Sequence, residues 1–313
     1  MKRIYLFASL LLCSMGFVLT GCSDDDLSST SVFAGDTIKA NGEFDKWLTK
    51  NYLETYNIDF QYRYNDKLTD QVYNVIPADV EKSKALAILV KHMWLFDSIY
   101  KREDPATYYE GKGRNFLKKY CPRQIQLIGS NEYSPNQSII LGTAEGGLKI
   151  MLYGVNRLDI DNPSINVENP YADRSEVPID MNYWFFHTMH HEFCHIMTQQ
   201  KNYSTDYQTI TGGSYHSQDW ANLKDTAVAK EGFVTAYASS EYNEDFAEMY
   251  ATYVTMTPSA WDMILAKAGP EGSALLQTKL AAVRAYFSES WNIDIDEMRA
   301  VLPLFGGNSL ESS

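Results

Sequence analysis

Residues 184–200 read WFFHTMHHEFCHIMTQQ and hold four of the six histidines of the chain. The run contains neither proline nor glycine, and its apolar side chains recur at helical spacing, which predicts a buried helix over 181–200. His191 and His195 are four residues apart, so on a helix both imidazoles lie on one face and can bind a single Zn²⁺ ion. Glu192 stands beside the first of them, where it can take a proton from a water at the metal without acting as a ligand.

A second predicted helix, over 243–256, offers the third protein ligand that a catalytic zinc site needs. We expect Glu244 to be this ligand, and Glu248, one turn later, to accept the second N–H of a ligating histidine and fix its tautomer. If Glu244 only faces solvent, Glu248 or Asp245 would be the ligand instead. Tyr237 is expected to donate its phenol hydrogen to the oxyanion of the tetrahedral intermediate, with a packing role as the alternative.

Three further side chains lie within or next to the motif. His187 shares the face of the two motif histidines, and we expect it to contact the ligands or support the fold rather than bind the metal. The alternative is that it competes as a ligand or lines the cleft. Cys194 lies off that face and is expected to be a packed thiol. His190 is expected to pack or to meet solvent.

The start of the chain predicts export and lipidation. Residues 1–21 contain a charged start followed by a short apolar segment, which is typical of a secretory signal peptide. The segment ends in Leu-Thr-Gly-Cys, which looks like the lipobox of bacterial lipoproteins, so Cys22 is the predicted lipidation site. An acidic run, 23–26, follows and resembles the export tag of some Gram-negative lipoproteins. We therefore expect a flexible acidic tether over 22–42 and a lipid-anchored protein on the outer membrane, exposed at the cell surface.

The remaining chain predicts one α+β domain over 43–313, with a sheet-containing part over about 43–178 and a helical part over about 179–305. The sheet is expected to be small and mostly antiparallel, and 148–153 is a candidate edge strand for an extended peptide. Cys121 and Cys194 are not expected to pair. The predicted strands are 58–64, 124–128, 138–141 and 148–153, and the later helices are 243–256, 259–268, 272–289 and 294–301.

The charge balance and the absence of certain motifs exclude other function classes. The formal net charge of −13 opposes binding to nucleic acid. No glycine-rich loop stands at a strand–helix junction, so no nucleotide site is predicted.

The motifs resemble those of the gluzincin branch of metallopeptidases, and the string from Tyr237 to Glu248 is similar to the corresponding region of anthrax lethal factor-type peptidases. More broadly, the chain resembles the zinc-binding metallopeptidase lipoproteins associated with SusC/SusD-type import, including Tyr56-Asn57-Ile58 and 142–147. The resemblance implies a zincin-like fold, a Zn²⁺ cofactor, and Tyr237, Glu244 and Glu248 as catalytic tyrosine, ligand and supporting acid. It also implies association with an outer-membrane import system.

Together these features predict a zinc-dependent metallohydrolase, and more narrowly a peptidase acting on a peptide or glycoprotein substrate. The alternative from another class is a non-catalytic zinc-containing surface lipoprotein that binds peptide or glycan for an outer-membrane importer. Hydrolysis of a non-peptide amide would use the same zinc site and is left open by the sequence.

Overall fold

The computed structural model describes residues 42–63, 75–95, 119–134, 137–174 and 178–301. The residues from Glu43 onward form one compact unit. The predicted signal peptide, Cys22 and nearly all of the predicted tether lie outside the described residues. Within the described ranges, no helix has the length and apolar character needed to cross a membrane.

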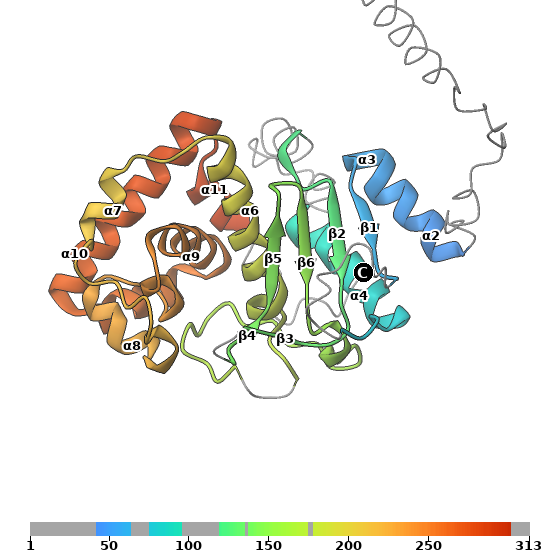
Figure 1. The fold of residues 1–313 in the computed structure, drawn as a ribbon, viewed down its shortest axis with the longest axis horizontal. Helices are drawn as coiled ribbons and strands as arrows, with labels where there is room; N and C mark the ends of the chain where they lie inside the picture. The colour runs from blue at the N-terminus through green and yellow to red at the C-terminus, as the bar shows by residue number, and fades with distance from the viewer. Residues whose placement is uncertain (1–41, 64–74, 96–118, 135–136, 175–177, 302–313) are drawn as a thin grey trace, which may run out of the picture. The chain divides into compact units, whose positions relative to one another are not determined.

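The unit places a small sheet before a helical second half, which confirms the α+β class (Figure 1). The strands are β1 (Asp59–Gln61), β2 (Gln124–Leu127), β3 (Glu132–Tyr133), β4 (Ile139–Ile140), β5 (Gly142–Glu145) and β6 (Lys149–Leu152). The α-helices are α2 (Glu43–Leu48), α3 (Glu54–Tyr56), α4 (Val80–Leu89), α6 (Thr188–Gln200), α7 (Asp206–Ile210), α8 (Asp225–Val228), α9 (Tyr242–Thr255), α10 (Pro258–Trp291) and α11 (Ile295–Val301). Short 3₁₀ or π-helical pieces are η2 (Thr49–Leu53), η3 (Val90–Trp94), η6 (Val155–Arg157), η7 (Asn182–His187), η8 (Trp220–Asn222), η9 (Ala229–Glu231) and η10 (Tyr237–Ser239).

The larger sheet has the order β1-β2-β6-β5 and is mixed rather than mostly antiparallel. Strand β2 is parallel to both β1 and β6, β5 is antiparallel to β6, and β3 pairs separately with β4 in antiparallel fashion. The parallel pairing of β1 and β2 follows from their connection, because the chain passes through α4 before it enters β2 and so returns in the same direction. Strand β5 has one neighbour and forms an edge. The predicted edge, 148–153, corresponds to β6, which is paired on both sides.

The helices of the second half follow the sequence pattern closely. The predicted helix over 181–200 is present as one helical run in which η7 continues into α6. The helices predicted over 259–268 and 272–289 belong to one element, α10, which is bent at Gly269, where φ is 68°. Glycine accepts this left-handed conformation, and the following Pro270 has no backbone N–H to donate to the helix. The gap between the two predicted helices therefore corresponds to a kink.

Helix α6 packs against β5 on one side and against α9 on the other (Figure 1). Its apolar side chains, among them Phe193 and Met197, are buried in the main hydrophobic core. Cys121 and Cys194 are both buried and are not joined in a disulfide. The histidine helix therefore lies between the edge strand and the helix that carries the acidic pair.

Candidate metal centre

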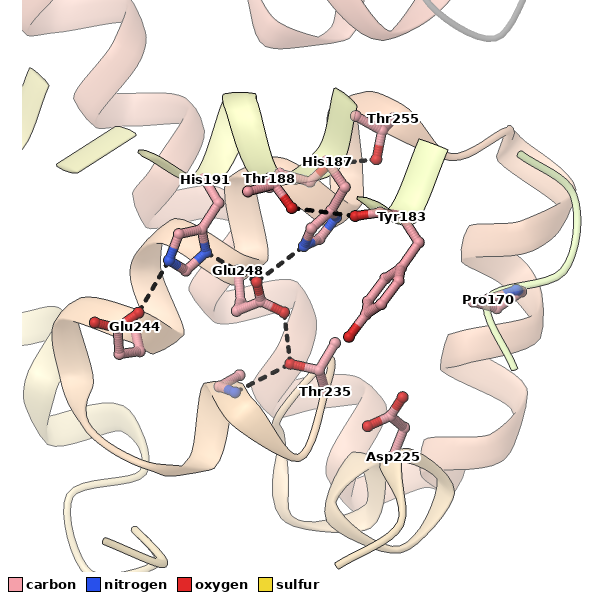
Figure 2. Close-up of polar contacts among 12 residues, drawn as sticks. Pro170, Tyr183, His187, Thr188, His191, Asp225, Thr235, Glu244, Glu248 and Thr255 are labelled. Carbon is pink, nitrogen blue, oxygen red and sulfur yellow. Dashed lines mark hydrogen bonds and ion pairs between the residues drawn. The ribbon is translucent and has the colours of Figure 1, made fainter. Parts of the chain in front are cut away.

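One face of the helical run through η7 and α6 carries three histidines. His187, His191 and His195 follow one another at four-residue spacing, so a helix with 3.6 residues per turn aligns them in a row. All three line one cleft, and Figure 2 shows His187 and His191 pointing toward α9. His190 lies on another face, buried, with its Nδ1 3.3 Å from the hydroxyl of Tyr250. The spacing thus separates the cleft histidines from the packing histidine.

Helix α9 brings Glu244 to the two motif histidines. Glu241 caps this helix by accepting a 3.1 Å hydrogen bond from the Glu244 N–H, which fixes Glu244 in the first turn. Nε2 of His191 lies 2.9 Å from Oε2 of Glu244 and 3.0 Å from Nε2 of His195. The distance from Nε2 of His195 to the same Glu244 oxygen is 3.3 Å.

These separations suit a zinc ion. Ligand atoms of a tetrahedral zinc site are about 3.3 Å apart when zinc–nitrogen distances are about 2.0–2.1 Å. His191, His195 and Glu244 form one of the two groups of described residues that can hold a metal ion. The donor set of two imidazoles and one carboxylate is typical of catalytic zinc, since it leaves a fourth position open. The residues present therefore fit the metal.

Glu248 is buried one turn beyond Glu244 and holds the histidines in place (Figure 2). Its Oε1 lies 2.8 Å from Nδ1 of His191 and 2.9 Å from Nε2 of His187. Its Oε2 accepts a 2.7 Å hydrogen bond from the hydroxyl of Thr235. Burial opposes ionisation of Glu248, but the two histidines hold the pKa of its carboxyl well below the usual value. The carboxylate keeps the His191 proton on Nδ1 and leaves Nε2 for a metal.

His187 contacts Glu248 rather than the proposed metal position. The second group that can hold a metal consists of His187, His191 and Glu248, and it uses atoms that already share hydrogen bonds. Burial disfavours the charged form of His191, yet hydrogen bonds with Glu244 and Glu248 raise its pKa well above the usual value. We interpret His187 as a hydrogen-bond partner of Glu248.

Glu192 is buried beside the cleft and faces β5. Burial is the largest influence and raises the pKa of its carboxyl, while the neighbouring imidazoles and a hydrogen bond from the Ala144 N–H act in the opposite direction. A carboxyl with a raised pKa is suited to exchanging protons near neutral pH. A Cβ added to Gly142 would lie 2.6 Å from Cγ2 of Thr188 and 3.7 Å from Cγ of Glu192. The glycine therefore permits the close approach of β5 to α6.

Tyr237 lies at the opening of the cleft on η10. Its ring centroid is 5.8 Å from that of His191 and 4.9 Å from that of Trp220, against which it packs edge-on. Burial, followed by the charge of Glu244, raises the pKa of the phenol, so the hydroxyl keeps its proton at neutral pH. Tyr237 is 37% exposed, which leaves it accessible to a bound ligand. The side chain is thus a hydrogen-bond donor close to the metal ligands.

Asp245 does not join the site. Its side chain is fully buried, with Oδ2 2.6 Å from Nζ of Lys279 and accepting a 2.9 Å hydrogen bond from the hydroxyl of Tyr215. Burial raises the pKa of Asp245 to about 6. A helical step of one residue turns it away from Glu244, so the structure places it against α10 instead of near the imidazoles. It is no substitute for Glu244 as a ligand.

The cleft has a volume of about 1130 Å³. It is lined by β4, β5, α6 and α9, by the short helical pieces η7, η8 and η10, and by residues of the connecting segments. Several of its residues were not singled out from the sequence, among them Thr235, Arg174 and Tyr183. Thr235 and Arg174 come from loops that have no periodic pattern, whereas Tyr183 lies in η7, inside the helix predicted over 181–200. The sequence marks them only by their position close to α6 and α9 along the chain.

Residues 37–296 match the protein family described as "Putative zinc-binding metallo-peptidase". A solved structure from Bacteroides caccae ATCC 43185, also described as a putative zinc-binding metallo-peptidase, is similar to this chain at 38% sequence identity, with a TM-score of 0.64. The similarity covers 86% of this chain and 93% of that chain. No curated protein matches.

Proposed function

The chain belongs to the family of putative zinc-binding metallo-peptidases, and from this premise we propose that it is a zinc-dependent peptidase. The observation that carries the proposal is the convergence of His191, His195 and Glu244, with Glu192 beside them and the His191 tautomer set by Glu248. A purely structural zinc site needs neither an adjacent buried carboxyl nor an open fourth position.

Zinc, when bound, would supply a Lewis acid that activates water and polarises the substrate carbonyl. His191, His195 and Glu244 would hold it. The Glu192 carboxylate accepts a proton from the attacking water, which forms the new carbon–oxygen bond, and then returns this proton to the leaving amine as the carbon–nitrogen bond breaks. The Tyr237 hydroxyl donates a hydrogen bond to the oxyanion that develops on the former carbonyl oxygen. These roles use only groups that line the same cleft.

Strand β5 supports a peptide as the substrate. It is an edge of the sheet, it lines the cleft, and it lies against the helix that carries the metal ligands. An edge strand presents unpaired backbone N–H and C=O groups with which an extended chain can form hydrogen bonds. Glu192 contacts this strand, because its carboxylate accepts a hydrogen bond from the Ala144 N–H. A peptide that pairs with the remaining backbone groups of β5 would lie beside Glu192.

The proposal is tested with the zinc-loaded wild type and its Glu192→Gln variant on a complex peptide and glycoprotein mixture, read by mass spectrometry. We expect new chain termini with the wild type and a loss of about 10²–10⁴-fold in rate with the variant, at unchanged zinc content. Glu289→Gln, an exposed substitution on α10, is the matched control and should behave as wild type. Equal cleavage by wild type and Glu192→Gln rejects the mechanism. No cleavage by either, with zinc bound, favours the binding role or another amide substrate.

We also propose, from the sequence, that the site is of the gluzincin type with a lethal factor-like tyrosine, and that the protein is anchored by Cys22 to the outer membrane beside an import system. The lipobox motif and the acidic run after it support this location. The Cys22→Ala variant should not incorporate labelled fatty acid and should leave the outer-membrane fraction. Labelling of this variant at the wild-type level contradicts the anchor.

A further inference from the structure

Strand β5 and helix α6 run in the same direction along the cleft. One end of the cleft therefore lies at the start of both elements, and the other lies where both elements end. A Cβ added to Gly142, at the start of β5, would touch Thr188, at the start of α6. A Cβ added to Gly147, just after β5, would lie 3.0 Å from Oε1 of Gln199, near the end of α6. The edge strand therefore passes the metal ligands in the direction from the start of α6 to its end.

This direction, combined with a preference for antiparallel pairing, favours one polarity of a bound peptide. Addition to an edge strand is somewhat more stable in the antiparallel sense than in the parallel one. A peptide antiparallel to β5 runs from Gln199 toward Thr188. The residues on the carboxyl side of the scissile bond then lie at the end of the cleft formed by Tyr183, Trp184 and His187, here named the η7 end.

Both arginines that line the described part of the cleft belong to the η7 end. The guanidinium carbon of Arg157 lies 4.3 Å from the ring centroid of Trp184, and that of Arg174 lies 4.1 Å from the ring centroid of Tyr183. No lysine is among the described residues that line the cleft, and the opposite end contributes uncharged side chains such as Asn202. Positive charge in the cleft is therefore confined to one end, in a chain with a net charge of −13.

Arg174 is positioned by its neighbours without using all its donors. Its Nη2 lies 3.2 Å from Oδ2 of Asp225 and donates to the carbonyl oxygen of Pro170 at 3.4 Å. The other oxygen of Asp225 accepts a 2.7 Å hydrogen bond from the Ala236 N–H, so this carboxylate is shared. A guanidinium has five N–H donors. The two distances involve one amino group, and one further hydrogen bond joins the guanidinium to the Tyr183 hydroxyl, so other donors remain. The Arg174 side chain is 31% exposed, which leaves it able to bind a second carboxylate.

Arg157 adds a second guanidinium to this end of the cleft. Unlike Arg174, it has no carboxylate partner among the described residues. Among the residues that the structure describes, its guanidinium stacks on Trp184 and takes part in no ion pair. An aromatic face holds a guanidinium in place without occupying its in-plane donors. The η7 end thus contains two arginines: Arg174 is positioned by the Asp225 carboxylate, and Arg157 is positioned by the Trp184 ring.

We propose that the η7 end of the cleft binds a carboxylate of the substrate, through Arg174 and with support from Arg157, on the carboxyl side of the scissile bond. The inference rests on the proposed peptidase function. The carboxylate has two possible sources, an aspartate or glutamate side chain after the scissile bond or the free C-terminus of a short peptide. Both present the planar anion that a guanidinium binds.

The test uses the zinc-loaded protein and matched peptides that are cleaved at one bond. One pair differs by glutamate or glutamine after this bond, and another by a free or amidated C-terminus. We expect kcat/KM to be about tenfold to a hundredfold higher for the carboxylate member of one pair, because this member makes one additional charge-assisted hydrogen bond. The pair that responds identifies the source. Equal values within both pairs overturn the proposal.

Variants assign the effect to the arginines. Arg174→Gln should bring the ratio within the responsive pair close to one, Arg157→Gln should lower it, and Arg174→Lys should keep part of it. Arg123→Gln, an exposed arginine outside the cleft, should keep the wild-type ratio. An Arg174→Gln variant that lowers kcat/KM equally for both members indicates a structural role and contradicts the proposal.

A binding measurement separates this inference from the proposed function. The zinc-loaded Glu192→Gln variant is titrated with the same peptides, labelled with a fluorophore. Tighter binding of the carboxylate member supports the arginine site even if the wild type cleaves nothing, in which case the peptidase proposal alone fails. Cleavage without any carboxylate preference in either assay leaves the peptidase and rejects the arginine site.

Discussion

The Glu248 carboxylate shows how a single side chain sets the state of the metal ligands. One oxygen meets two imidazoles and the other meets the Thr235 hydroxyl, which itself accepts a 3.0 Å hydrogen bond from the Ala238 N–H. Because Thr235 donates its only hydroxyl hydrogen, it orients the carboxylate toward His191. Thr235, which lies outside α6 and α9, would thus act on a bound metal through two successive hydrogen bonds.

Thr235→Val should lower zinc affinity by about 10–100-fold, since it removes a hydrogen bond that orients a ligand histidine. Zinc competition with a chromophoric chelator measures the change. Thr252→Val is the matched control, because this threonine is also buried and its hydroxyl has no partner among the described residues. Unchanged zinc affinity in Thr235→Val, with the fold intact, contradicts an orienting role.

The sequence predicts which residues of the candidate metal site lie together only where their spacing is that of a helix. His191 and His195, like Glu244 and Glu248, lie one turn apart, so local geometry alone places each pair on one face. Arg174 belongs to a loop, and nothing in its local sequence indicates that it stacks on Tyr183. Such a position depends on tertiary packing, which a periodic pattern does not encode.

At the scale of elements, α9 is joined to α10 by a buried ion pair. Nζ of Lys279 lies 2.6 Å from Oδ2 of Asp245, donates to the carbonyl oxygen of Gly232 at 2.7 Å, and sits 3.9 Å from the ring centroid of Phe233. Both charged side chains are fully buried. Asp245 follows Glu244 in the chain, so this contact also restrains the helix start that presents the third metal ligand.

Lys279→Met should destabilise the protein by about 3–5 kcal/mol, because it leaves the Asp245 carboxylate buried without its partner. Denaturant unfolding of the zinc-loaded protein measures the free energy. The double variant Asp245→Asn/Lys279→Met should recover part of the loss, and Lys267→Met, exposed on the same helix, should have little effect. A loss as small as that of Lys267→Met rules out a structural role for the pair.

The order and direction of the strands in the larger sheet could not be predicted from the sequence. The short apolar segments around Ile125 and around Ile150 each predict a strand, since β-branched side chains favour buried sheet positions. Strand direction and order depend on the connections and on packing against helices, so a sequence with strands of three or four residues does not determine which one forms the edge. The bend of α10 at Gly269 is the opposite case, where one local signal located the break.

The proposed metal would join parts of the chain that are distant in sequence. His195 and Glu244 are 49 residues apart, and they sit on two helices that pack against each other. Binding of zinc to the folded protein would therefore stabilise the entire unit, by about 4 kcal/mol when zinc exceeds its Kd a thousandfold.

Removal of zinc with a chelator should lower Tm, and the gap between loaded and stripped protein should widen as pH rises from about 5 to about 8. In the stripped protein the pKa of His191 is raised. A raised histidine pKa gives stability that is present below the ordinary value and is lost as pH rises through the folded value. Zinc binding has the opposite trend, because its histidine ligands must lose their protons. Thermal scans of both forms across this range provide the check, and a gap that narrows with pH contradicts the coupling.

If the proposed peptidase activity holds, the edge position of β5 determines which proteins can be substrates. Pairing with this strand requires the substrate backbone to offer its own N–H and C=O groups over several residues, in a fully stretched conformation. Segments already folded into helices or inner strands have those groups engaged, and a proline lacks the N–H. The enzyme would therefore discriminate by conformation before it discriminates by side chain, leaving compact native proteins untouched and attacking exposed linkers, denatured chains and partly degraded fragments.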